Sequence, residues 1–287
     1  MALIAAFLSA VFSSSKDLFS KKLSFKIEGT LSAFASFLFA LPYYLLVLCL
    51  LGFLGLENFT INREILILVF LRSVSDTLAE LLKMHAIGKA DISLISSVFA
   101  LYPLILLFVS PLITGDNSSP VLIAATVIIV AGSMLLVWRS GSQSVKNQWP
   151  GVLLAVGSAF CFALNTSFDR LAAQASTPVF AAFSMTFLSC IFLTPFALRS
   201  SSGSAYSLLK SNKGALFARG FFEIGFMVLK LYALSVLHAP YVVGIQKSAV
   251  LFSIIGGKVF FKEADFKRRF LAGILVFCGI IMILFFA

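Results

Sequence analysis

The sequence is dominated by apolar runs of about 20 residues, which recur along the whole chain and are separated by short polar segments. A run of this length crosses the ~30 Å hydrocarbon core of a bilayer when it is helical. Inside hydrocarbon, only helices and closed barrels satisfy every backbone hydrogen-bonding group. Barrel strands would alternate apolar and polar residues, and these runs do not. The pattern therefore predicts an all-α integral membrane protein.

The composition agrees with this fold class. The chain is 60% hydrophobic and only 12% charged, whereas soluble proteins carry about 25% charged residues. Turn and charge signals divide the apolar runs into ten predicted transmembrane helices. Their approximate ranges are 2–20, 30–54, 64–86, 92–113, 120–138, 150–171, 178–198, 214–236, 240–260 and 269–286.

The basic residues are distributed unevenly between the connecting segments. Sixteen of the 22 lysines and arginines fall in or beside the connections that follow odd-numbered spans, and only Arg63 and Arg170 fall on the opposite side. Cytoplasmic loops of membrane proteins carry an excess of Lys and Arg. We therefore expect a multi-pass protein of the cell (inner) membrane with both termini on the non-cytoplasmic side. The net charge of +10 indicates this topology and not a nucleic-acid partner.

The chain contains an internal repeat. Residues 70–139 align with 217–286 without a gap, and LSAVFSSSKDLFSKK matches GSAFCFALNTSFDRL at a slightly different offset. The aligned pairs include Arg72 with Arg219, Asp76 with Glu223, Lys83 with Lys230 and Gly132 with Gly279. We therefore expect two five-helix domains, residues 1–139 and 150–287. Because five is odd, the second half enters the membrane in the opposite sense, which is the inverted-repeat plan of many transporters.

Several segments carry a family resemblance. YALSVLHAPYVVGIQKSAVLFSIIGGKVFFKE and RRFLAGILVFCGIIMILFF, with their first-half counterparts HAIGKADISLISSVFALYPLILLFVSPLITGD and VLIAATVIIVAGSMLLVW, resemble EamA-type transporters of the drug/metabolite transporter superfamily. The resemblance covers nearly the whole chain. It implies ten helices, two inverted halves and the carriage of small metabolites. It does not specify the substrate, because the superfamily moves molecules as different as amino acids, sugar nucleotides and lipid-linked compounds.

Charged residues interrupt the apolar segment 64–86. Arg72, Asp76, Glu80 and Lys83 lie within about 80° of one another on a helix, so they form one polar stripe. Arg219, Glu223 and Lys230 repeat this pattern in segment 214–236. An isolated Arg at mid-bilayer costs about 2.5–3.5 kcal/mol on insertion scales. Both stripes are therefore expected to face the protein interior or a water-filled cavity.

Each charged residue of these stripes has a functional and a structural interpretation. Arg72 and Arg219 are candidates for substrate binding, but each can also be tied to the acid four residues later, Asp76 or Glu223. Lys83 and Lys230 lie near helix ends, where lysines extend to the membrane surface. Glu80 has no acidic equivalent in the second half, where Met227 takes its place. It is therefore the candidate for contacting substrate or binding a coupling proton.

A second lysine lies inside a predicted span. Lys247 is eight residues into segment 240–260, beside Gln246 and Ser248, with no acidic residue within a turn. An intramembrane lysine is a functional-site hypothesis by default. Lys247 and Gln246 are therefore candidates for substrate binding, the alternative for Lys247 being a tie to an acid on another helix.

A polar face is also predicted on segment 150–171. Ser158, Asn165 and Asp169 lie within about 40° of one another on a helix. Asn165 is therefore a further candidate for substrate binding. Asp169 and Arg170 are expected at the non-cytoplasmic end of the helix, as a local anchor or gate.

The sequence shows no signature of an enzyme. It has no nucleotide-binding loop, no metal-ligand spacing and no nucleophile paired with a base, so we expect neither catalysis nor a cofactor. We expect a secondary transporter that moves a small anionic or zwitterionic metabolite by alternating access, with proton coupling as a further expectation. A flippase for a lipid phosphate or lipid-linked head group is the alternative. A non-transporting membrane receptor or scaffold is a third reading, but it would predict an additional soluble domain.

Overall fold

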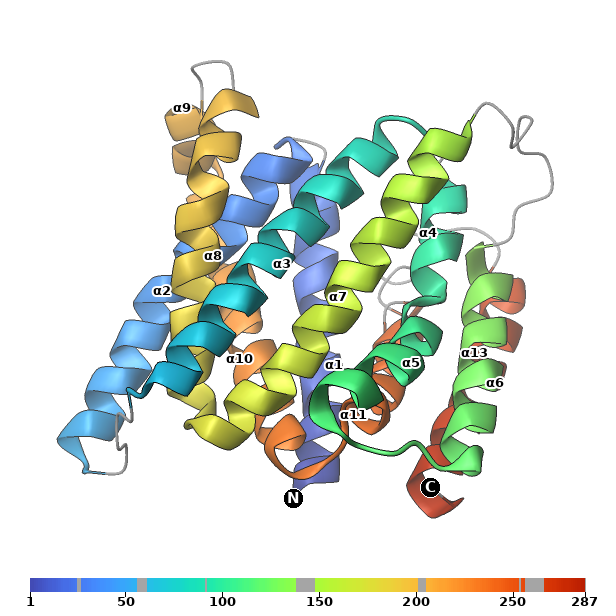
Figure 1. Ribbon diagram of the computed structural model, residues 1–287. Helices are drawn as coiled ribbons and strands as arrows, with labels where there is room; N and C mark the ends of the chain where they lie inside the picture. The colour runs from blue at the N-terminus through green and yellow to red at the C-terminus, as the bar shows by residue number, and fades with distance from the viewer. Residues whose placement is uncertain are drawn as a thin grey trace. The chain divides into compact units, whose positions relative to one another are not determined.

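The computed structural model describes residues 1–24, 27–55, 61–90, 92–137, 148–200, 205–252, 254–255 and 266–286. The elements of these residues are α-helices (Figure 1). They are α1 (Ala2–Ser24), α2 (Gly29–Phe53), α3 (Arg63–Ile87), α4 (Ile92–Ala100), α5 (Tyr102–Thr114), α6 (Pro120–Val137), α7 (Trp149–Ala175), α8 (Pro178–Ser200), α9 (Ala205–Ser211), α10 (Lys213–Val236), α11 (Ala239–Gln246) and α13 (Phe266–Phe286).

Some predicted features fall outside the described residues. The connection 139–149 is described only from residue 148 onward, and residues 256–260 of the ninth predicted span are not described. The same holds for several basic residues used for the orientation: Lys26, Arg139, Lys146, Lys258 and Lys262.

Most predicted spans correspond to one helix each, but two do not. Segment 92–113 divides into α4 and α5, which are separated at Leu101. Pro103 lies in the first turn of α5, where its missing N–H and its ring interrupt the helix that precedes it. Segment 240–260 begins with α11, which ends at Gln246, and residues 249–252 are helical again. Under the offset of the sequence repeat, Leu101 corresponds to Ser248, so the two breaks are equivalent positions.

Four helical stretches of the described residues are both long and apolar enough to cross a membrane: Ala2–Ser20, Gly29–Phe53, Trp149–Ala175 and Pro178–Arg199. Helices α3 and α10 are of similar length, 25 and 24 residues, but contain more charged side chains. Three further apolar helical stretches, Tyr102–Thr114, Pro120–Leu135 and Leu271–Phe285, are shorter. The fold is thus all-helical, and length and apolarity alone do not reproduce the predicted count of ten.

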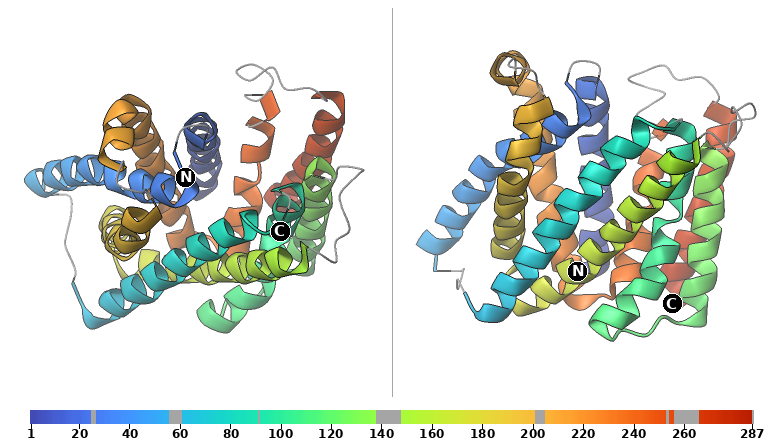
Figure 2. Two further views of the ribbon diagram at one scale, coloured as in Figure 1. Left: turned by 90° about the horizontal axis from the view of Figure 1, so that it is seen from above. Right: turned by 45° about the horizontal axis from the view of Figure 1, so that its top comes forward.

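The chain folds as two compact units, each of which combines segments from both halves of the sequence. Unit 1 comprises Met1–Thr77 and Phe168–Leu237, and unit 2 comprises Leu78–Ser167 and His238–Ala287. Helices α3 and α7 contribute one part to each unit. Within unit 1, α10 packs against α1 and α2, and α2 packs against α8. Within unit 2, α6 packs along α13, and these helices lie side by side in all views (Figure 1, Figure 2).

The contact between α6 and α13 reproduces the sequence repeat. A Cβ atom added at Gly132 would lie 2.9 Å from the Val276 backbone nitrogen, and one added at Gly279 would lie 2.8 Å from the Ala125 carbonyl oxygen. Gly132 also faces Ala272, and Gly279 also faces Ile129. Each glycine therefore meets residues that the offset makes equivalent: Gly132 with Gly279, Ala125 with Ala272 and Ile129 with Val276. Small residues permit membrane helices to approach closely. Here α6 brings one such glycine against α13, and α13 brings the equivalent glycine against α6.

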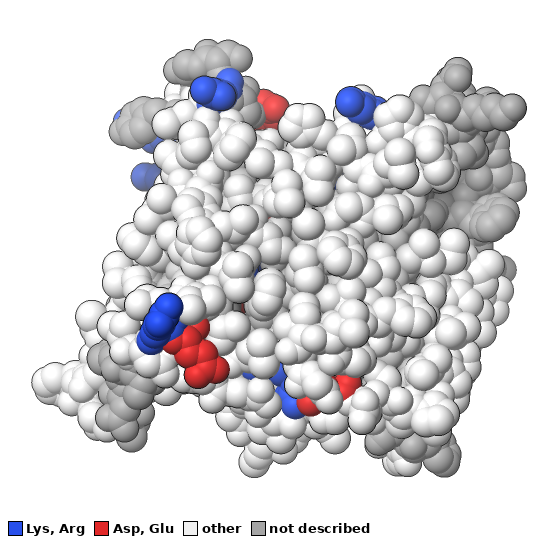
Figure 3. Space-filling view, in the orientation of Figure 1, with Lys and Arg blue, Asp and Glu red and all other residues white. Residues whose placement is uncertain are grey.

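Helix α3 has an exposed apolar face and a buried polar face. The side chains of Leu66, Phe70 and Val74 are exposed, at spacings of four residues, whereas Arg72 and Asp76 are buried. The expected polar stripe thus turns inward and leaves an apolar face outward, as a helix in lipid requires. On the face drawn in Figure 3, charged side chains are sparse and most of the visible surface is uncharged.

Candidate functional site

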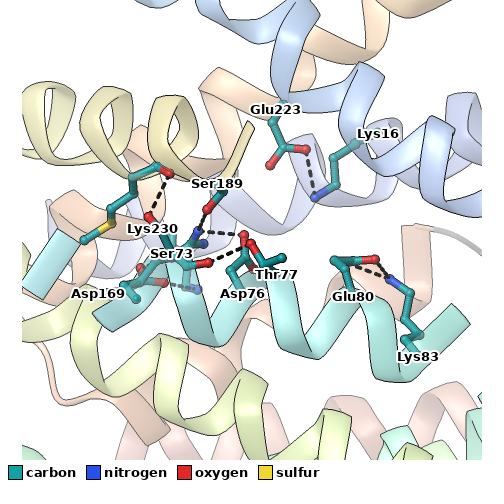
Figure 4. A network of polar contacts seen from close by, with 12 residues as sticks. Lys16, Ser73, Asp76, Thr77, Glu80, Lys83, Asp169, Ser189, Glu223 and Lys230 are labelled. Atoms are coloured by element: carbon teal, nitrogen blue, oxygen red, sulfur yellow. Dashed lines mark hydrogen bonds and ion pairs between the residues drawn. The ribbon is translucent and has the colours of Figure 1, made fainter. Parts of the chain in front are cut away.

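A buried ionic cluster lies within unit 1 and consists of Arg72, Asp76, Asp169, Ser189 and Lys230, here called the Arg72 cluster (Figure 4). Arg72 Nη1 donates to Asp76 Oδ2 at 2.8 Å and to Ser189 Oγ at 3.3 Å. Arg72 Nε donates to Asp169 Oδ1 at 3.1 Å, and Lys230 Nζ donates to Asp169 Oδ2 at 2.7 Å. Asp169 is fully buried and gives one oxygen to each cation. The cluster joins α3, α7, α8 and α10 and contains two positive and two negative side chains.

The sequence prediction was incomplete for Asp169. The expected pair of Arg72 with Asp76 forms, but Asp169 is the centre of the cluster and not a peripheral anchor. One signal in the sequence pointed to it. Lys83 has Glu80 three residues before it, whereas the equivalent Lys230 has Met227 there, so the counter-charge of Lys230 had to come from another helix. The neighbouring Arg170 is an anchor, since its Nη1 donates to the Leu234 and Leu237 carbonyls at the end of α10.

A second cluster in unit 1 surrounds Glu223 and is called the Glu223 cluster. Glu223 Oε2 accepts a hydrogen bond from Ser36 Oγ at 3.1 Å and forms an ion pair with Lys16 Nζ at 3.2 Å. Arg219 donates to the carbonyl and hydroxyl oxygens of Ser32. Lys16 is one of the sixteen basic residues assigned above to the connections, but it lies inside α1 and pairs with Glu223 of α10. Its Nζ is also 4.2 Å from the centroid of the Phe226 ring.

The two clusters are built from equivalent residues. Each has an arginine and an acid one turn apart, on α3 or on α10. In the first cluster Arg72 contacts Ser189 of α8, and in the second Glu223 contacts Ser36 of α2. Those serines, Ser36 and Ser189, both stand six residues before the proline inside their helix, Pro42 or Pro195. The clusters differ in the further partner, which is a lysine of α1 for Glu223 and a carboxylate of α7 for Arg72.

In unit 2, Glu80 and Lys83 form an ion pair. Lys83 Nζ lies 2.8 Å from Glu80 Oε1 and 2.7 Å from Oε2, and 5.6 Å from the centroid of the Phe162 ring. Glu80 is therefore the local partner of Lys83 in this structure. On α7, Ser158 Oγ donates to the Ala79 carbonyl at 2.7 Å, and Asn165 is buried.

The other polar group of interest in unit 2 lies at the break after α11 and is called the Lys247 site: Lys247, Ser248, Tyr102 and Thr166. Lys247 is the first residue after α11 and is half-buried. Among the described residues its Nζ has no carboxylate or hydrogen-bond acceptor, and its contact is the Tyr102 ring, with a centroid distance of 5.8 Å. Ser248 Oγ is buried and likewise has no hydrogen-bond partner in the described part of the chain. The sequence candidate Gln246 is the last residue of α11.

Tyr102 is held in place by α7. Its hydroxyl lies 2.6 Å from Thr166 Oγ1, which in turn donates to the Phe162 carbonyl at 3.2 Å. Either hydroxyl can be the donor in the contact between Tyr102 and Thr166. Tyr102 therefore offers Lys247 the face of a fixed ring. The break before α5 thus supplies Tyr102, and the equivalent break after α11 supplies Lys247 and Ser248.

Comparison with known proteins then identifies the family. The sequence profile described as "EamA-like transporter family" matches residues 1–138 and again 149–285. The chain belongs to the EamA-like transporter family. As such it is a membrane transport protein of the drug/metabolite transporter superfamily, a family of transporters and not of enzymes. No curated protein matches the EamA-like chain.

A solved structure shares the fold of this EamA-like protein. It is described only as "Crystal structure of protein", superposes with a TM-score of 0.74 and is 16% identical in sequence. The match covers 98% of this chain and 95% of the other. Among the described residues of the EamA-like protein, no group of three or more His, Cys, Asp and Glu side chains is placed to hold a metal ion.

Proposed function

We propose that the protein is a secondary transporter that moves a small anionic or zwitterionic metabolite by alternating access. Its ten transmembrane helices would form two inverted five-helix repeats, residues 1–139 and 150–287. Family membership supports transport, and the reciprocal glycine contacts of α6 and α13 support the repeat. The excess of Lys and Arg in alternate connections favours an inner-membrane protein with both termini on the non-cytoplasmic side.

We infer the substrate class from Lys247, whose ammonium group has no acceptor among the described residues. A charged group inside a membrane protein is expensive unless it is paired, and unpaired ones mark substrate or ion pathways. A cation over an aromatic ring gains about 0.5–2 kcal/mol, which is less than the several kcal/mol that desolvation of an ammonium costs. Tyr102 therefore does not compensate Lys247. An anionic group of a substrate would.

The other sequence candidates divide between two roles. The cations of the Arg72 cluster are already bound to carboxylates, so we assign Arg72, Asp76 and Lys230 to fastening helices. We assign Arg219 and Glu223 to the equivalent contact of α10 with α2 and α1. This leaves Lys247 as the main candidate for substrate binding. Gln246 lies beside it in the sequence, and Asn165 is next to Thr166 of the Lys247 site.

This arrangement suggests how binding promotes the conformational change. An empty site keeps a lone ammonium that needs water or a polar lining, so closing around it is unfavourable. A bound anion neutralises Lys247, and the occluded state then encloses a pair and not a single charge. Substrate would therefore accelerate the exchange between inward-open and outward-open states, which is the behaviour that counterflow measures.

The test is counterflow by the purified protein in liposomes, screened across anionic and zwitterionic metabolites. We expect protein-dependent counterflow that falls at least ~10-fold in Lys247→Ala, because a charge-assisted hydrogen bond contributes about 1.5–3 kcal/mol. Lys89→Ala is the matched control, since Lys89 is exposed. Lipid-phosphate flipping without metabolite counterflow would replace the proposal by a flippase. Equal rates in both variants would remove Lys247 from the site.

A further inference from the structure

We infer that the Lys247 site accepts a single negative charge, so that the substrate is a monoanion of the monocarboxylate type and not a phosphate monoester, a dicarboxylate or a zwitterion. This inference rests on the proposed function, because it specifies the ligand of the same site. It follows from the charges that the structure places in unit 2 and from the hydrogen-bonding groups that remain there.

The first step concerns the cations. Every other basic side chain that the clusters bring inside the helices has an acceptor: Arg72 and Lys230 bind Asp169, Lys83 binds Glu80, Lys16 binds Glu223, and Arg170 and Arg219 donate to carbonyl oxygens. Within the described residues, this leaves Lys247 as the interior cation without an acceptor. The site therefore offers one positive charge.

The second step concerns the acids of unit 2. The described part of this unit contains two, Glu80 and Asp116. Glu80 is bound to Lys83, and Asp116 Oδ1 lies 3.5 Å from His238 Nε2. Neither carboxylate contacts Lys247, which lies over the ring of Tyr102. Among the described residues of unit 2, the site thus has no carboxylate for the ammonium group of a zwitterion.

The third step compares ligand charges. A phosphate monoester carries about −1.5 to −2 at pH 7, so one lysine would leave about half to one negative charge uncompensated. Charge left over in this way is what makes buried ions unfavourable. A carboxylate matches the single positive charge of Lys247. Its oxygens can accept from the ammonium, which has three donors, and from the hydroxyl of Ser248, which has no other described partner.

The experiment uses proteoliposomes loaded with an equimolar mixture of small probes from four charge classes. Lactate and glycerate represent monoanions, glycerol 3-phosphate represents phosphate monoesters, succinate represents dicarboxylates and alanine represents zwitterions. Protein-dependent exchange of each probe is followed in parallel. We expect the monoanions to exchange at least ~10-fold faster than any other class, a factor that corresponds to one charge-assisted hydrogen bond.

Variants separate a change in charge class from a loss of folding. Lys247→Gln should lower monoanion exchange at least ~10-fold. Ser248→Ala should lower it less, because the Ser248 hydroxyl is a neutral donor to the carboxylate whereas Lys247 carries the opposite full charge. A monoanion should raise the melting temperature of the wild-type protein but not that of Lys247→Gln. This second readout stays valid where a variant transports nothing.

Two failures are distinguishable. Exchange of glycerol 3-phosphate, succinate or alanine at a rate equal to or above that of the monoanions overturns the single-charge inference and leaves the transport proposal standing. The absence of Lys247-dependent exchange for every class overturns the proposed function, and the inference with it.

Discussion

The Arg72 cluster and the Lys247 site treat positive charge in opposite ways. In the Arg72 cluster, four charged side chains from α3, α7 and α10 neutralise one another, with Asp169 shared between two cations. At the Lys247 site, a cation stands at a helix break over the ring of Tyr102, which is itself bound to Thr166. Lysine appears in both places, so residue type alone does not separate a structural charge from a functional one. The presence of a counter-charge does.

The comparison has an energetic consequence. Removing one partner from a buried ionic pair leaves an uncompensated charge and is strongly destabilising. Removing Lys247, a half-buried cation without an acceptor among the described residues, leaves no stranded partner. Substitutions in the Arg72 cluster should therefore act mainly on stability, and substitutions at Lys247 mainly on transport.

The largest effect is expected for Asp169→Asn. This change takes a full counter-charge from Lys230 and one of two from Arg72, so we expect the free energy of unfolding to fall by about 3–5 kcal/mol. Thermal or denaturant unfolding in detergent measures it. Glu64→Gln on the exposed start of α3 is the matched control. A melting curve of Asp169→Asn that overlays the wild type would show that the cluster does not fasten the helices.

A second substitution asks what Asp169 contributes. In the Asp169→Asn background, Met227→Glu places an acid three residues before Lys230, as Glu80 stands before Lys83. We expect this to restore about 1.5–3 kcal/mol, the contribution of a charge-assisted hydrogen bond. Recovery of the free energy of unfolding would show that the main role of Asp169 is to neutralise Lys230. Without recovery, the bridge from Arg72 to Lys230 through one carboxylate would be the essential feature.

Sequence reasoning predicted the parts of this fold that depend on local pattern. Apolar run length located the helices, and helical spacing placed Arg72 beside Asp76 on an inward face. The role of Asp169 was not predicted, because its partners are 97 and 61 residues away and are chosen by packing between helices. Lys16 was misplaced for a similar reason, since its position near a predicted helix end gave no indication of Glu223.

The sequence indicates the helix breaks only in part. Pro103 is a local signal for a kink in its span, and α4 and α5 are separate helices. The break after Gln246 has no proline, so nothing local revealed it. The internal repeat could have done so, because Leu101 and Ser248 are equivalent positions. That Lys247 lies at a break therefore emerged from the structure.

A smaller effect on stability is expected for Glu80→Gln. The Glu80–Lys83 pair is partly solvated, with side-chain exposures of 15% and 28%, and such pairs contribute about 0.2–1 kcal/mol. If Glu80 binds a coupling proton, Glu80→Gln should lose the dependence of uptake on a pH gradient but retain substrate exchange, which needs no net proton movement. Uptake that still follows the gradient would leave Glu80 a structural partner of Lys83 alone.

The most direct test of the unpaired role of Lys247 combines counterflow and unfolding on one variant, Lys247→Met, in the same preparation. We predict that monoanion counterflow falls at least ~10-fold, while the melting temperature is equal to or higher than that of the wild type. Counterflow at the wild-type rate would contradict a substrate role. So would a large drop in melting temperature with normal counterflow per folded molecule, because Lys247 would then be a structural tie like Lys230.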